Sequence, residues 1–438
     1  MNGIYVMLNG NFEHGIGAAY PDLIADNLKP LSFDPQSLLL HYTWSQQAND
    51  ASEYRARESS LGMNGCWTEG YLIIRACNFV IEDVDKYREE NTAKADAIKG
   101  QAYAIRALVH FKLVNIFSQP YKFTSDASHI GIPYITTSDI SVTYNRQTVG
   151  EIYKSVIEDC KNAIELLKDD ARMDTRFMNK AATEGLLSRI YLFKEDYVNA
   201  NSLAVKLINE HPLMRIQDGY PDDIFKFKDV SETETLFQLT PINLDFPNIS
   251  SFLGRYFRGP TLRYVATNDI AILLNENFND VRSNWVKKVG EQWEINKYPI
   301  EAAPTAVPSI AISETAYYPA VIRSSEMCLI AAESSVKLGN ENDARTYLDL
   351  IRKRACPAVA SITVSGQALL DSIFKERRKE LAFEGFRMYD LQRWKLGVHR
   401  KDVLYSAAID LPFGDNRSIA PIPLTEVRLA GLSQNKGY

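Results

Sequence analysis

Apolar and polar residues alternate with a helical period over most of this chain. Trp67, Tyr71, Ile74, Asn78 and Ile81 follow one another at spacings of four, three, four and three. Residues with this spacing lie on one face of a helix, so the pattern predicts a helix here. The same reasoning predicts further helices at about residues 2–11, 93–117, 151–167, 179–193, 323–337 and 343–354, and one that ends near residue 210.

These helices are expected to come in pairs. A helix with a small residue, Ala182 or Ala332, leads to a polar turn at residues 194–200 or 338–344, and an alanine-bearing helix follows. This arrangement resembles tetratricopeptide-type helix pairs, whose repeat is about 34 residues. The pattern suggests roughly four such pairs, and each would bury its apolar stripe by packing on its neighbours. The sequence therefore predicts a mostly α-helical scaffold, with pairs at residues 66–117, 151–193, 180–210 and 323–395.

Two stretches interrupt this scaffold and are expected to form an irregular lobe. Eight prolines break helices between residues 212 and 318, and glycines and prolines punctuate the segment before residue 65. Residues 235–240 and 291–296 alternate apolar and polar side chains, which predicts two short strands. We expect one domain over residues 1–438, with the scaffold at about 66–210 and 323–395, the loop-rich lobe at about 12–65 and 212–320, and a C-terminal segment at 396–438.

One long helix is predicted at residues 371–395. No proline occurs there, and Leu370, Phe374, Leu381, Met388 and Leu391 recur on one face. A glycine at position 385 shares this face, so another backbone could approach closely.

Charged residues alternate in sign along the same predicted helix. Glu384, Arg387, Asp390 and Arg393 stand three residues apart, which favours a ladder of ion pairs. Because aromatic residues separate these charges, we expect partly buried arginine–carboxylate pairs rather than a solvated face. Such pairs fix geometry more than they add stability. The helix is therefore interpreted as a structural element and not as an active site.

The composition excludes several classes of protein. A net charge of −6 makes nucleic acid an unfavourable partner. No apolar stretch approaches the roughly 18 residues that a membrane span requires. The five cysteines are odd in number and form no Cys-x-x-Cys motif, so we expect most to be small buried apolar residues.

Motifs for catalysis or metal binding are missing from the sequence. The six histidines are scattered, without a His-Glu-x-x-His motif, and no phosphate-binding glycine loop or Gly-x-Ser-x-Gly motif occurs. No loop matches the Asp-x-Asn-x-Asp-Gly pattern of a calcium site. We therefore expect no catalytic residues, cofactor or metal. Paired carboxylates, as in a glycoside hydrolase, stay open because the chain has 55 aspartates and glutamates.

Two C-terminal motifs carry a resemblance to a known family. The run from Glu376 to Trp394, ERRKELAFEGFRMYDLQRW, resembles the C-terminal hallmark of the SusD/RagB family of outer-membrane nutrient-binding lipoproteins. Residues 421–426 and 432–438 resemble the ending of the same family. The predicted helix pairs and the interrupting lobe also follow the family's order.

The resemblance implies a fold, a function and a location. The fold would be SusD-like, and the protein would be a non-catalytic, cell-surface binder of oligosaccharides. It would deliver them to a TonB-dependent, SusC-like outer-membrane transporter. Family members begin with a signal and a lipidated cysteine, so we expect such an anchor upstream of this sequence in the precursor, on the extracellular face of the outer membrane.

Aromatic and polar residues in the predicted lobe are candidates for ligand contact. Ring faces grip the apolar surface of a sugar while polar groups bond its hydroxyls, and the resemblance places such an arc on corresponding loops. For each aromatic, filling the lobe's own core is an equally good explanation. The candidates are Tyr20, Asp26, Asn27 and Trp44 in the first stretch and Tyr256, Tyr264, Trp285 and Trp293 in the second.

Three other functions remain compatible with the sequence. One is a peptide-binding member of the same family. The second is an all-helical glycoside hydrolase, which would turn over an oligosaccharide and lose activity when one acid is replaced. The third is an intracellular tetratricopeptide scaffold, which would have a peptide-sized groove and no affinity for sugars.

Overall fold

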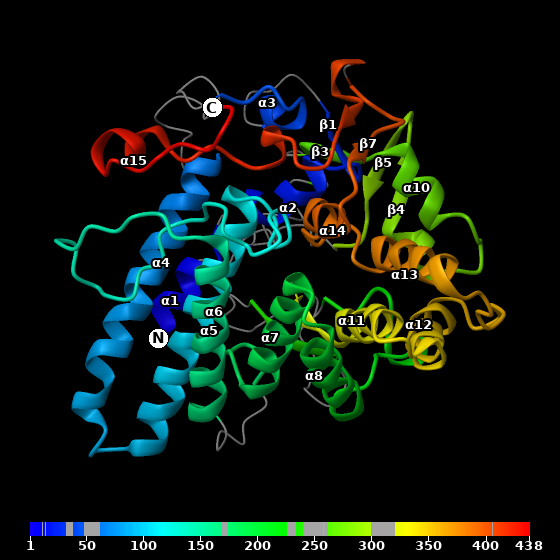
Figure 1. The fold of residues 1–438 in the computed structure, drawn as a ribbon. Coiled ribbons are helices and arrows are strands. Elements are labelled where there is room, and N and C mark those ends of the chain that lie inside the picture. Colours follow the sequence, from blue (N-terminus) through cyan, green and yellow to red (C-terminus); the bar gives the residue numbers. More distant parts are fainter. Residues whose placement is uncertain are drawn as a thin grey trace, which may run out of the picture. The chain divides into compact units, whose positions relative to one another are not determined.

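The computed structural model describes residues 1–10, 12–13, 15–31, 38–47, 62–167, 174–225, 234–239, 257, 262–298, 320–404 and 406–438. The described chain is mostly helical and contains a few short strands (Figure 1). It divides into two compact units. Unit 1 comprises Met1–Arg172 and Gly385–Tyr438, and unit 2 comprises Met173–Glu384.

Unit 1 is built around a long helical hairpin. Its two arms, α4 (Met63–Asp83) and α5 (Thr92–Phe117), run side by side, and α6 (Val149–Leu166) packs on α5 (Figure 1). This confirms the predicted pair at 66–117. The remaining elements of the unit are α1 (Asn2–Leu8), α2 (Ile16–Leu23), β1 (Leu28–Pro30), α3 (Leu39–Tyr42), η3 (Val84–Tyr87), α14 (Arg387–Arg393), β7 (Val398–His399), η8 (Ser406–Ala408), β8 (Asp410–Leu411), η9 (Asn416–Ser418) and α15 (Leu424–Leu429).

A buried ion pair fixes α5 against α6. Arg106 on α5 donates from Nε and Nη2 to both carboxylate oxygens of Asp159 on α6, at 2.7 and 2.6 Å. Its third nitrogen donates to the side chain of Asn78 on α4 at 2.8 Å. One guanidinium therefore connects α4, α5 and α6.

Unit 2 contains two further helix pairs. Helix α11 (Ser324–Lys337) packs on α8 (Tyr197–Glu210), α12 (Glu341–Ala355) and α13 (Gly366–Glu380), and α7 (Lys180–Lys194) packs on α8. The core between α11, α12 and α13 uses Ala332, Ala344, Leu348, Leu369 and Ile373. Alanine at two of these positions removes side-chain bulk, so the axes can approach closely.

The polar turns predicted between these helices are confirmed. Glu195, which follows the end of α7, has a left-handed conformation, and the side chain of Asp196 caps α8. Helix α11 is followed by Gly339 with φ of +82°, where glycine is the residue best suited to end a helix. The helices of the predicted pair 151–193, α6 and α7, belong to different units.

Short antiparallel strands complete unit 2. Strand β2 (Thr235–Gln238) pairs with β6 (Ala320–Arg323), and β5 (Gln292–Ile295) pairs with both β3 (Tyr264–Ala266) and β4 (Val286–Val289). Strands β2 and β5 confirm the two predicted strands. The other elements are η4 (Ile216–Asp218), α10 (Asn268–Leu274) and η7 (Val281–Trp285).

The prediction of one unbroken helix over residues 371–395 is wrong. Helix α13 ends at Glu380, and α14 begins at Arg387. Phe383 and Gly385 between them have φ of +66° and +82°, which a right-handed helix does not allow. The carbonyl groups of residues 380 and 382 accept hydrogen bonds from the Lys297 ammonium, and that of Phe383 accepts one from the Tyr298 hydroxyl. These donors replace the helical N–H groups, and the cation also suits the negative end of a helix.

The predicted ion-pair ladder holds only in part. Arg393 does donate to Asp390, with 2.8 Å between Nε and Oδ1. Glu384 instead pairs with Arg323 and Lys297, and Arg387 pairs with Asp26. Since α13 and α14 are separate helices, residues three apart across the break do not share a face. The expectation that these pairs are partly buried is nevertheless confirmed, because their side chains are largely enclosed.

Cysteine burial and membrane spanning can be judged for the described residues. All five cysteines are buried, and none forms a disulfide, as predicted. Among the described residues, no helix is both long enough and apolar enough to cross a membrane.

Gly385 confirms the predicted close approach of another backbone. A Cβ at this position would lie 2.7 Å from the carbonyl oxygen of Ala18 on α2. Gly339 has the same φ of +82° with open space around it, and so provides a matched control. We expect Gly339→Ala to lower the free energy of unfolding by about 1–2 kcal/mol, through the left-handed backbone alone.

Gly385→Ala should cost about 1–3 kcal/mol more than Gly339→Ala, because α2 must also move. Chemical denaturation of both variants measures the difference. Equal losses would show that the contact with Ala18 carries no strain.

His110 in unit 1 should stay neutral far into the acid range. Burial, reinforced by the nearby positive charge of Arg106, lowers the pKa of His110 to about 3. The backbone N–H of Ile135 donates to its Nε2 at 3.1 Å, so this nitrogen is an acceptor. The unfolded chain binds a proton at about pH 6.5, where the folded protein does not. This group therefore lowers the free energy of unfolding as the pH falls from about 6.5 toward 3.

An NMR titration of the histidine ring protons measures this directly. The His110 signals should not shift between pH 8 and 5. A His110 midpoint near 6.5 would contradict the burial argument.

Candidate functional site

The first group of candidate residues lies in the interior of unit 1. Tyr20 on α2 is fully buried, and its hydroxyl is 3.3 Å from Nδ1 of His41. Trp44 is also buried, and its indole N–H donates to the Ile24 carbonyl oxygen at 3.0 Å. The structure corrects the prediction that these rings present a face to ligand, because both pack against the protein itself.

The two polar candidates of this group hold α14 against the segment after α2. Asp26 accepts two hydrogen bonds from the Arg387 guanidinium, at 2.6 and 2.9 Å. Asn27 donates to Asp22 at 2.6 Å, and Asp22 accepts from the Gly385 N–H at 2.7 Å. Asp26 and Asn27 are buried. Their role in this structure is positioning, which corrects the expectation that they meet sugar hydroxyls.

In unit 2, two of the predicted rings are core residues as well. Tyr264 on β3 and Trp285 on η7 are fully buried. The Nζ of Lys297 lies 3.8 Å from the centroid of the Trp285 ring, and the Tyr220 ring meets its edge. The structure corrects the prediction for both residues, because a ring enclosed in this way cannot stack on a sugar. Tyr256 lies outside the described residues.

Trp293 differs from the other rings because it is only half-buried. It lies on β5, opposite Lys288 of β4 and Ala266 of β3. Ile295, two residues further along the strand, is buried on the same face. Trp293 therefore lies at the edge of an apolar face and is partly exposed to solvent.

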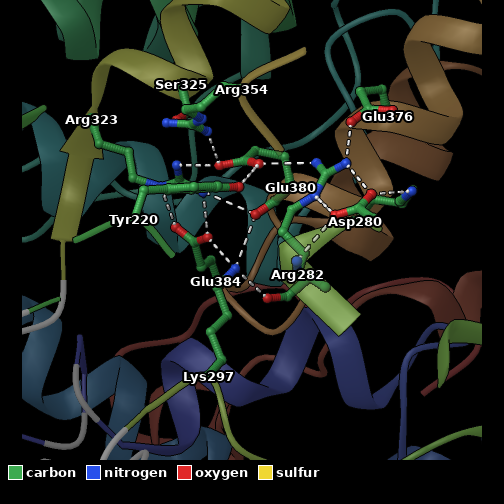
Figure 2. Close-up of polar contacts among 12 residues, drawn as sticks. Tyr220, Asp280, Arg282, Lys297, Arg323, Ser325, Arg354, Glu376, Glu380 and Glu384 are labelled. Carbon is green, nitrogen blue, oxygen red and sulfur yellow. Dashed lines mark hydrogen bonds and ion pairs between the residues drawn. The ribbon is translucent and has the colours of Figure 1, made fainter. Parts of the chain in front are cut away.

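A buried network of charged side chains is centred on Glu380 of α13 (Figure 2). It includes Arg282, just before the β4–β5 hairpin, and Lys297, just after it. The Glu380 carboxylate accepts four hydrogen bonds. They come from Arg323 at 2.8 Å, Arg354 at 2.7 Å, Arg282 at 3.0 Å and the Tyr220 hydroxyl at 3.0 Å. Two carboxylate oxygens have about four acceptor positions, so Glu380 is saturated.

Glu384 is a second acceptor in the network. Arg323 donates to both of its oxygens, at 2.9 and 2.7 Å, and Lys297 donates to one at 2.6 Å. The remaining protons of Lys297 reach the carbonyl oxygens of Glu380 and Ala382, both at 2.9 Å. All three ammonium protons are thus used at the end of α13.

Arg282 connects the start of the hairpin to α13. Its Nη2 lies 2.8 Å from Asp280 and 2.6 Å from Glu376. Asp280 also accepts from Lys379 at 2.7 Å. Since η7 with Arg282 directly precedes β4 and Lys297 follows β5 by two residues, the network anchors both ends of the hairpin that carries Trp293.

Glu234, which directly precedes β2, connects the network to α12. It accepts from Arg323 at 2.9 Å and from the Met214 N–H at 3.1 Å, and it also pairs with Arg354 of α12. The network therefore spans β2, β6, α12, α13 and the hairpin.

Burial and neighbouring charge act in opposite directions on these groups. Burial favours the neutral form of Glu380, but Arg354, Arg323 and Arg282 outweigh it and hold its pKa well below 4.5. Burial lowers the pKa of Lys297 to about 8, against the attraction of Glu384. The site is thus ionised at neutral pH, and each carboxylate is engaged by cations.

Sequence patterns predicted only part of this network. Glu384 stands among aromatics, which indicated a buried pair, whereas Glu376 and Glu380 carried no such signal. Their partners at positions 282, 297, 323 and 354 are ordinary charged residues, each far away in sequence. Hydrophobic periodicity carries no signal for such pairings.

No group of three or more histidine, cysteine, aspartate and glutamate side chains in the described part of the chain is arranged to hold a metal ion.

The network predicts acid-sensitive stability. Below about pH 4.5 the unfolded chain takes up protons on Glu380 and Glu384, while the folded protein resists doing so. Both pKa values are lowered by folding, so the free energy of unfolding should fall as the pH drops from 5 to 3. Glu384→Gln should cost about 3 kcal/mol at pH 7, because Arg323 and Lys297 stay buried without their carboxylate.

Denaturant titrations between pH 7 and 3 test this expectation. The same substitution at an exposed glutamate, Glu89→Gln, is the control and should change little. A Glu384→Gln variant as stable as the parent would contradict a role for the charge.

Two family models match the chain. One, described as starch-binding associating with outer membrane, matches residues 13–192. The other, described as the SusD family, matches residues 275–438. Together they include the helical hairpin of unit 1, the Trp293 hairpin and the whole 376–394 run.

Known proteins agree with these matches. SusD-like protein P2 of Formosa agariphila is 26% identical over 377 residues, which are 76% of this chain and 71% of that protein. A SusD superfamily structure from Bacteroides thetaiotaomicron has a TM-score of 0.85 at 27% identity, covering 99% of this chain and 97% of that one. A structure from Bacteroides vulgatus, named a putative sugar binding protein, has a TM-score of 0.82 at 28% identity, covering 100% of this chain and 97% of that one.

The resemblance seen in the C-terminal motifs is thus matched over nearly the full length of the fold. The chain belongs to the SusD/RagB family.

Proposed function

We propose that this protein captures oligosaccharides at the bacterial cell surface and delivers them to a SusC-like, TonB-dependent outer-membrane transporter. Family membership supports carbohydrate binding and an association with the outer membrane. The similar structure from Bacteroides vulgatus, named a putative sugar binding protein, points the same way.

The observation that carries the proposal is the half-exposed ring of Trp293 on an anchored hairpin. A sugar ring presents an apolar C–H face, and an indole is a large, flat partner for it. Because η7 and Lys297 hold both ends of the hairpin through buried ion pairs, the ring is positioned before ligand arrives. Binding then loses less conformational entropy than it would on a mobile loop.

A polar group suited to hydroxyl recognition lies beside this ring. Lys288 is directly opposite Trp293 on the neighbouring strand and so shares its face. A polar group beside an apolar platform is the arrangement expected of a small-ligand site.

The carboxylates that the structure describes in this region support ligand binding without catalysis. A glycoside hydrolase needs two acids facing a cleft, about 5–10 Å apart. Glu376, Glu380 and Glu384 are instead buried and paired with arginine or lysine. They are engaged by cations and so are poorly placed to exchange protons with a substrate. We therefore propose a binding protein rather than an enzyme.

Replacing the Trp293 ring tests the proposal. A glycan array would first identify an oligosaccharide ligand of the parent protein, and calorimetry would then compare variants. Trp293→Ala should weaken binding by about 1–3 kcal/mol, the scale of an aromatic hot spot.

The matched control is Tyr87→Ala, which removes an exposed ring at the tip of the α4–α5 hairpin and should leave affinity unchanged. If no glycan binds, or if Trp293→Ala binds like the parent, the stacking site is refuted. Release of a shortened saccharide would refute the non-catalytic assignment.

A further inference from the structure

A groove of about 1100 Å³ runs along one face of α12 in unit 2. Helix α12 supplies residues at positions 342, 345, 346, 349, 350, 353 and 354, which share one side of a helix. Its opposite side, with Ala344 and Leu348, packs into the helical core. The other walls are Ile208 near the end of α8, residues 212–217 after it, and Pro357, Ser361 and Ile362 after α12.

The apolar lining of this groove is aliphatic. Ile208, Leu213, Met214, Leu350 and Ile362 contribute to it, together with two prolines. None of the described lining residues is aromatic. The groove thus offers contacts for aliphatic side chains, but not the flat ring surface on which a sugar stacks.

The charges that line the groove are mainly positive. Arg215, Arg345, Lys353 and Arg354 line it, and Asp349 is the one acid among the described lining residues. Asp349 is occupied, because it pairs with Lys353 and Arg352 and accepts from the backbone N–H of residue 362. The other acids that pair with the lining cations, Asp218, Glu341, Glu234 and Glu380, lie outside the lining.

Intramolecular partners orient Arg215 and Lys353 while much of each side chain stays in solvent, whereas Arg345 is 24% exposed and Arg354 is buried. Arg215 pairs with Asp218 while 68% of its side chain stays exposed. Lys353 is 45% exposed beside Asp349. An anion entering the groove would meet positioned cations that need little reorganisation.

The length of the groove suits an extended segment. From Asn342 to Arg354, α12 advances about 18 Å at 1.5 Å per residue. An extended chain covers this distance with about five or six residues. The volume also reaches the upper end of the range of small-molecule pockets, about 300–1,000 Å³.

We infer that this groove binds an extended peptide segment of a partner protein that carries both acidic and aliphatic side chains. The aliphatic residues pack on the lining of the groove, and the carboxylates pair with Arg215, Arg345 and Lys353. Trp293 does not line this groove, and the inference does not rest on the proposed sugar capture.

Fluorescence anisotropy with a labelled hexapeptide of alternating glutamate and leucine tests this inference on the full chain. The parent protein should bind the peptide, and added salt should weaken binding because the paired charges are partly exposed. The double variant Arg215→Glu/Lys353→Glu should bind at least about tenfold more weakly, since two attractions become repulsions.

The control is Lys375→Glu, which reverses a lysine that is also half-exposed and acid-paired, on α13 outside the groove. It should bind the peptide like the parent, and circular dichroism would confirm that both variants are folded. Trp293→Ala should also retain peptide binding, so failure of the sugar site would not be confused with failure of this one.

The inference would be overturned if the parent did not bind the peptide, if the double variant bound it equally well, or if a lysine–leucine hexapeptide bound as strongly. Preferential binding of oligogalacturonate, an anionic carbohydrate, would assign the groove to a different ligand and would also overturn it.

Discussion

The ion pairs around Glu380 are the constraint on which unit 2 depends. A carboxylate removed from water is costly unless hydrogen bonds and opposite charges replace its hydration. Glu380 obtains both from three arginines and a tyrosine, which come from separate elements of the unit. These elements must therefore be in place together, and the network specifies their arrangement as well as contributing to stability.

The network also explains how an irregular region can carry a binding surface. Short strands provide few backbone hydrogen bonds, so a hairpin such as β4–β5 would be weakly held by pairing alone. Lys297 and Arg282 anchor its two ends to α13, and the rings of Trp285 and Tyr298 are enclosed around them. The buried aromatics support the hairpin, and the half-buried Trp293 is the ring that we propose for ligand contact. The groove along α12 shares Arg354 with the network but has a different lining, aliphatic and cationic, so the two surfaces suit different ligands.

Part of the fold was predictable because its signal is local. The helices and the turns at 194–200 and 338–344 follow from apolar spacing, small residues and capping positions within a few residues of one another. The 376–394 run was informative for a different reason, since charges interleaved with aromatics indicated buried pairs, and its resemblance to the SusD/RagB family agrees with the full-length comparisons. The ligand residues were less predictable. In the sequence, Trp293 is an aromatic residue of the predicted lobe like Tyr20, Trp44, Tyr264 and Trp285. Only the fold shows that those four are buried and that Trp293 is half-buried.

The sequence by itself determined the helical class, the positions of most helices, the need for a small residue at 385 and the family. Each of these depends on residues close together in the chain. Only the tertiary structure decided that α13 stops at Glu380, because the donors that replace its helical hydrogen bonds, Lys297 and Tyr298, lie more than 80 residues away. It likewise decided which acid pairs with which arginine and which ring keeps a face in water. Partners and burial are properties of elements that meet in space, and no local pattern encodes which elements those are.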